Sequence, residues 1–158
     1  MKKIFILFLI LLSSCSLKEQ TMPTDFQIVY KWTSGAIEDP YTITTTFSAN
    51  TMEGEIVFNH DNLPPAWIER FSVEKKYLED MYARCNDAGI FNTNLEQDPD
   101  YPDGGATQSM LIIAYGQEYR VPYNFVADKK QEEAIYSLYD DIDALAFQGM
   151  LENSSTQH

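Results

Sequence analysis

An acidic loop holds the side chains best suited to binding a metal ion. Asp98, Asp100 and Asp103 precede Gly104 in the stretch DPDYPDGG, and carboxylates gathered around a glycine turn can bind Ca²⁺. The spacing departs from the EF-hand pattern because Pro102 stands at the fifth position, where that pattern needs an oxygen ligand. A solvated acidic loop with a Pro-Asp-Gly turn is the competing interpretation. The sequence otherwise predicts no metal and no cofactor.

Histidine gives little support to catalysis. His60 lies beside Asp61, and the pair with a serine would resemble a hydrolase site, whereas His158 is the last residue. The chain contains neither a G-x-S-x-G nor an H-E-x-x-H motif, and it has no Cys/His set with zinc spacing. We therefore expect a protein that is not an enzyme and assign no catalytic residue, with a hydrolase as an alternative.

A rigid segment offers a candidate binding surface. In NLPPAWI, at 62–68, Leu63 and Trp67 flank a diproline. Tryptophan is enriched among residues that dominate binding energy, and a stiff loop loses little entropy when it binds. Leu63 and Trp67 are therefore candidate binding residues, together with the acids of the 92–108 loop. The alternative is that Trp67 folds back onto the edge of the sheet.

The chain begins like an export signal. Lys2 and Lys3 precede an unbroken apolar run at 4–12, which is a positive region followed by a short hydrophobic region. The run is too short to span a bilayer as a helix, which takes about 20 residues.

The stretch LSSC at 12–15 resembles the lipobox of bacterial lipoproteins. The resemblance implies that residues 1–14 are a signal peptide cut after Ser14 and that Cys15 carries a diacylglyceryl thioether, with its amino group open to acylation by a palmitate-like chain. Ser16 follows, where that family reserves aspartate for retention at the inner membrane. The resemblance therefore implies an envelope protein, at the outer membrane in a Gram-negative cell.

Charge narrows the range of partners. Removal of Lys2 and Lys3 from a chain of formal charge −13 leaves −15, so nucleic acid is not an expected partner. Anionic head groups would repel such a body, which leaves the lipid to hold it at the membrane. Residues 15–24 then form a polar tether, and the plausible charged partners are cationic proteins, peptides or divalent ions.

The second cysteine fits a structural role. Cys85 shares a helical apolar stripe with Tyr77, Leu78, Met81 and Tyr82, because these residues recur at helical spacing. With Cys15 lipidated it has no disulfide partner in the chain. We expect it to be buried.

The remaining pattern predicts one α+β domain at 25–150, followed by a polar tail at 151–158. Alternating apolar residues predict strands at 26–33, 41–48, 52–59, 109–115 and 118–124, the last two joined by a type II′ turn at Gly116-Gln117. A helix capped by Ser72 should run from residue 73 to about 88, and a helix begun by a capping box at Asp128 and Gln131 should end before Gly149. The expected order is βββ-α-ββ-α, a mostly antiparallel sheet of about five strands with two helices on one face.

A second resemblance concerns layout. W-T-S-G-A-I at 32–37, a helix ending in A-G-I-F at 88–91, and P-D-G at 102–104 before a strand resemble emfourin-type inhibitors of secreted metalloproteases. Gly35-Ala36 stands where that family has a glycine pair, and no inhibitory contact is transferred to this chain.

Together these observations lead us to expect a lipid-anchored envelope protein that binds a protein or peptide as an accessory module. Inhibition of a secreted protease and hydrolysis in the envelope are the alternatives.

Overall fold

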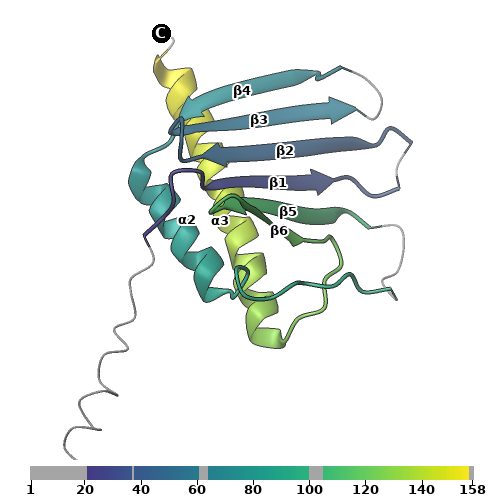
Figure 1. Ribbon diagram of the computed structural model, residues 1–158. Coiled ribbons are helices and arrows are strands. Elements are labelled where there is room, and N and C mark those ends of the chain that lie inside the picture. Colours follow the sequence, from purple (N-terminus) through teal and green to yellow (C-terminus); the bar gives the residue numbers. More distant parts are fainter. Residues whose placement is uncertain (1–20, 37, 61–63, 100–104, 157–158) are drawn as a thin grey trace, which may run out of the picture.

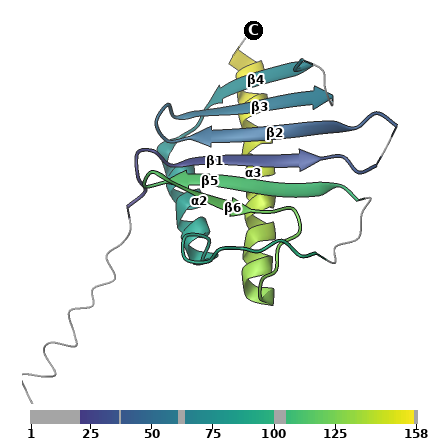
Figure 2. The same cartoon turned by 45° about the vertical axis from the view of Figure 1, so that its right-hand side comes forward.

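The computed structural model describes residues 21–36, 38–60, 64–99 and 105–156 (Figure 1). Its strands are β1 (Gln27–Thr33), β2 (Tyr41–Ser48), β3 (Glu53–His60), β4 (Trp67–Ser72), β5 (Thr107–Ala114) and β6 (Gln117–Val121), and its helices are α2 (Lys75–Asp87) and α3 (Lys129–Thr156). The strands form one sheet in the order β4-β3-β2-β1-β5-β6, and every neighbouring pair is antiparallel. Both helices lie on one face of this sheet (Figures 1 and 2), which confirms the predicted α+β class.

The sheet has one strand more than predicted. Residues 67–72 form β4 at the edge, where the sequence had indicated a loop and a helix cap. Pro64 and Pro65 lie in the connection before β4, so they interrupt the chain without ending the sheet. An edge strand tolerates such neighbours because only one of its sides is paired. Phe71 anchors β4 in the core with 6% of its surface exposed.

The core fills the space between the sheet and the two helices. The period-2 pattern of β1 is confirmed, because Phe26, Ile28 and Tyr30 are buried on the helix side. The cross-strand neighbours of β1 continue this face, with Phe47 opposite Ile28 on one side. Burial of these side chains supplies the main driving force for packing the sheet on the helices. The largest fully buried side chains are Phe26, Ile28, Tyr30, Phe47, Leu78, Ile90, Ile112, Val121, Ile135, Leu138, Tyr139 and Ile142.

Helix α2 starts later than predicted and ends as predicted. Its N-cap is Glu74, whose side chain makes no capping bond, and Ser72 is the last residue of β4. The predicted Ser72 cap is wrong because Ser72 pairs with Glu53 of β3 as part of the edge strand. At the other end, Ala88 is the C-cap and Gly89 adopts φ +71°, the left-handed conformation typical of a glycine after a helix.

Helix α3 begins as predicted, with one difference. The Asp128 carboxylate accepts a hydrogen bond from the Gln131 N–H at 2.9 Å, as an N-cap does. The predicted capping box places the Gln131 side chain on the backbone N–H of the N-cap residue. The Gln131 side chain donates instead to the Ala88 carbonyl at 2.9 Å. The Gln131 amide therefore ties the end of α2 to the start of α3.

The predicted end of α3 is wrong, because the helix continues through Gly149 to Thr156. Gly149 is buried, and a Cβ at this position would overlap the ring of Phe71. The glycine thus serves close packing of the helix on β4 and does not act as a helix terminator.

The β5–β6 turn is also displaced from its predicted position. Tyr115 and Gly116 form the turn with φ values of +56° and +69°, and Ala114 pairs with Gln117. Positive φ at both central residues is typical of a type I′ turn, not the predicted type II′. The Asp25 carboxylate accepts the N–H groups of Tyr115 (3.0 Å) and Gly116 (2.6 Å), which holds the turn against the start of the domain.

Candidate functional site

Large side chains line one end of the sheet on the helix side. The register carries this row across four neighbouring strands, from Trp32 of β1 to Trp67 of β4. Tyr41 and His60, paired on β2 and β3, extend it toward the strand ends. We call this surface the aromatic platform; its members are Trp32, Tyr41, Ile43, Phe58, His60 and Trp67.

The rings of the platform touch in a chain. The ring centroids of Trp32 and Tyr41 are 5.4 Å apart, and those of Tyr41 and Phe58 are 5.1 Å apart. His60 meets Phe58 edge to face at 5.2 Å. Such pairs stabilise their own arrangement beyond the area that they bury, so these four rings support one another.

The platform is only partly covered. Trp32 follows Tyr30 by two residues and shares its face, yet it is half-buried where Tyr30 is buried. The reason is visible in both ribbon views, where the strands extend beyond helix α3 (Figures 1 and 2). Trp67 exposes 40% of its surface. Aromatic rings that are packed and exposed at once are typical of binding surfaces.

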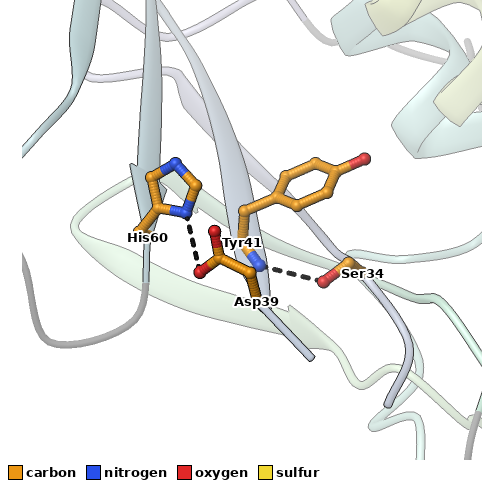
Figure 3. Close-up of polar contacts among 4 residues, drawn as sticks. All are labelled: Ser34, Asp39, Tyr41 and His60. Atoms are coloured by element: carbon orange, nitrogen blue, oxygen red, sulfur yellow. Dashed lines mark hydrogen bonds and ion pairs between the residues drawn. The ribbon is translucent and has the colours of Figure 1, made fainter. Parts of the chain in front are cut away.

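Polar contacts fix the connection from β1 to β2 beside the platform (Figure 3). The buried Ser34 hydroxyl accepts the Tyr41 N–H at 2.9 Å, and the Ser34 N–H donates to the Tyr41 carbonyl at 2.9 Å. Asp39 Oδ1 lies 3.2 Å from His60 Nδ1. These contacts hold the connection against the start of β2 and the end of β3.

These contacts bear on the hydrolase alternative. The carboxylate that contacts the His60 ring belongs to Asp39, and Asp61 lies outside the described residues. In Figure 3 the Ser34 hydroxyl faces the Tyr41 backbone and not the imidazole. Among the described residues no serine contact to His60 is found, and such a contact is what a nucleophile with its base requires.

Acidic side chains of α3 border the platform. The Tyr30 hydroxyl accepts a hydrogen bond from Gln108 Nε2 at 2.7 Å and donates to Asp143 Oδ2 at 3.4 Å, and Gln108 is the cross-strand neighbour of Trp32. Burial raises the pKa of the Asp143 carboxyl, the Tyr30 hydrogen bond opposes this shift, and the negative charge of Asp140 adds to it. Asp143 therefore lies beside Tyr30, the residue that precedes Trp32 on the helix side of β1.

The strand cations lie on the opposite face of the sheet. Lys31, Arg70 and Arg120 are the lysines and arginines of the described strands. Each is adjacent in sequence to a residue on the helix side, such as Trp32 or Phe71, so alternation places all three away from the platform. Arg70 is bound there to Glu55 at 2.6 Å. The platform thus has acidic neighbours and no strand cation.

The predicted binding residues have separate locations. Trp67 belongs to the platform, whereas Asp98 lies in a loop paired with the segment before α3, where its N–H donates to the Asn124 carbonyl at 2.5 Å. The structure gives no contact between these two residues. Four further predicted residues lie outside the described part of the chain: Cys15, Leu63, Asp100 and Asp103.

Sequence reasoning missed most of the platform. The sequence pattern identifies the aromatic residues of β1 and β2 only as the apolar face of strands, and it does not distinguish Phe58 from other strand residues. Their period-2 spacing was the available signal. It does not indicate which part of an apolar face a helix leaves uncovered.

The second cysteine has the buried position that the sequence predicts. Cys85 is fully buried, and burial raises the pKa of its thiol to about 12, which confirms a structural cysteine. Within the described residues no group of three or more His, Cys, Asp or Glu could hold a metal ion. In the same part of the chain, no helix is long and apolar enough to cross a membrane.

A shallow groove of about 290 Å³ lies between α2 and α3. An ion pair between Arg84 and Asp141 crosses it, and Tyr77 and Leu145 contribute its apolar wall. The pair joins the two helices on the side away from the sheet.

Comparison with models of known protein families finds no match to this chain, and comparison with curated proteins finds no similar one.

Proposed function

We propose that this chain is a lipid-anchored envelope protein that binds a protein or peptide partner through the aromatic platform. The observation that carries the proposal is the exposed edge of that platform, where Trp67 of β4 pairs with Phe58 of β3 and exposes 40% of its surface. Aromatic side chains of this kind supply most of the energy in many interfaces, since they bury large areas at low entropic cost.

The position of the platform suits an anchored binder. Asp25 and Thr21 contact the β5–β6 turn, the latter through its carbonyl, which accepts the Tyr115 hydroxyl at 3.2 Å. The platform lies at the opposite ends of the strands, because β1 runs from Gln27 beside this turn to Trp32. That stretch covers about 17 Å.

The proposed anchor would hold the turn end of the sheet near the bilayer. Cys15 and Thr21 are six positions apart, which an extended chain spans in at most about 22 Å. A lipid at Cys15 therefore favours an orientation in which the β5–β6 turn faces the membrane and the platform faces away from it. A partner would then approach from the aqueous side.

Partner capture tests the platform. The full chain is purified from solubilised envelope with bound proteins cross-linked, and the parent is compared with Trp67→Ala and Ile68→Ala. Ile68 is the matched control, because it is 46% exposed on the same strand but points to the other face. We expect Trp67→Ala to lose a partner that the parent and Ile68→Ala retain. Equal capture by all three proteins would exclude the platform.

Mass spectrometry of the native product tests the anchor separately. A chain beginning at Cys15 and carrying diacylglyceryl and acyl groups is expected, and Cys15→Ala should abolish both processing and membrane retention. An unmodified thiol or an intact leader would refute the anchor and leave the binding proposal standing.

A further inference from the structure

We infer that the aromatic platform recognises a positively charged segment of its partner, one that presents arginine or lysine. The inference rests on the proposed function and specifies the ligand class of the same surface. It is carried by three observations: the platform rings are only partly buried, carboxylates lie beside them, and the lysine and arginine side chains of the strands lie on the other face of the sheet.

The ring faces provide the first part of the recognition. A guanidinium or ammonium group placed over a tryptophan or tyrosine ring is attracted by the negative charge of the ring face. Trp67 and Trp32 end the row on β4 and β1, and Tyr41 lies between β1 and β3 with its ring against Trp32. Arginine is especially suited to such a surface because its planar group stacks on rings.

Carboxylates provide the second part. Asp39 exposes 78% of its side chain beside His60, and Asp143 borders the platform from α3 through its bond to Tyr30. The lysines and arginines of the described strands all point the other way, so none of them competes with an incoming cation for these carboxylates. Charge complementarity therefore selects a cationic segment over a neutral or acidic one.

The two tryptophans make this testable without a label. Trp32 and Trp67 are the only tryptophans in the chain, and both belong to the platform, so intrinsic fluorescence reports on this surface. The full chain, purified in a non-ionic detergent, is titrated with the peptide acetyl-Gly-Arg-Gly-Arg-Gly-amide. The control peptide has citrulline in place of arginine, which keeps the shape and removes the charge.

We expect saturable binding of the arginine peptide at least about tenfold tighter than that of the citrulline peptide, with Trp67→Ala weakening it about threefold to tenfold. Trp32 remains as the reporter in that variant, and Ile68→Ala should bind like the parent. Unchanged thermal unfolding of each variant would show that the domain is intact. Equal affinity for the two peptides would overturn the inference and point to apolar or glycan recognition.

The net negative charge of the chain requires a second control. The double variant Asp39→Asn with Asp143→Asn is compared with Glu53→Gln with Asp87→Asn, which removes the same charge from the far end of β3 and the end of α2. We expect only the first pair to weaken the arginine peptide by more than about threefold. Equal weakening by both pairs would mean that the peptide responds to total charge and would refute a site on the platform.

The outcomes separate the two proposals. If partner capture depends on Trp67 and the two peptides bind alike, the binding function stands and the cationic specificity fails. If capture is independent of Trp67, the function itself is refuted.

Discussion

Replacement of Tyr139 by phenylalanine is expected to stabilise the fold. Tyr139 is 1% exposed, and its hydroxyl has no hydrogen-bond partner in the described part of the chain. Its ring packs against Tyr30 at 5.1 Å and Tyr136 at 6.0 Å, so the apolar contacts would survive the change. A buried polar group without a partner costs about 1–3 kcal/mol, and the loss of one oxygen leaves only a small gap. We expect a net gain of about 1 kcal/mol.

The neighbouring tyrosine supplies the matched comparison. The Tyr30 hydroxyl is bonded to Gln108 and Asp143, so Tyr30→Phe removes two partners and should cost about 1–2 kcal/mol. Thermal unfolding of both variants is the assay, and 1 kcal/mol corresponds to about 3 °C in a domain of this size. If Tyr139→Phe lowers the unfolding temperature as Tyr30→Phe does, the Tyr139 hydroxyl has a partner and the reasoning fails.

Three further changes test the packing and the electrostatics. Gly149→Ala should destabilise by about 1–2 kcal/mol in denaturant unfolding, because crowding against Phe71 outweighs the better helix propensity of alanine; a more stable variant would contradict the packing. Asp143→Asn should be more stable than the parent at pH 7 and equally stable below about pH 3.9. Folding raises the pKa of the Asp143 carboxyl, so the parent protein loses stability as the pH rises through that pKa, and the variant does not. A stability difference that stays constant across pH would contradict this reasoning. Asp25→Ala should cost about 1–2 kcal/mol and speed amide exchange at the β5–β6 turn, whose N–H groups lose their acceptor; unchanged exchange would show that the turn holds itself.

Local patterning accounts for what could be predicted of the fold. Strand β2 has the predicted bounds, and the alternation in β1 placed Ile28 and Tyr30 in the core. These features follow from the period of the side chains, which each segment carries by itself. The left-handed Gly89 and the Asp128 cap are local in the same sense, since a few neighbouring backbone groups decide them.

The errors share a different cause, because each depended on a distant partner. Ser72 became a strand residue by pairing with Glu53, and Gly149 stayed helical because it meets Phe71. The β5–β6 turn is fixed by the carboxylate of Asp25, about 90 residues away in the chain. Neither glycine spacing nor a capping residue reveals such contacts.

The sequence by itself determined the class of the fold, the strong negative charge and the buried cysteine, because composition and periodicity suffice for these properties. It also led to the prediction of lipidation at Cys15. Only the tertiary structure decided the candidate site. A strand pattern shows which side chains share a face, but exposure of that face depends on where α3 crosses the sheet, and the position of α3 is set by packing between residues far apart in the chain.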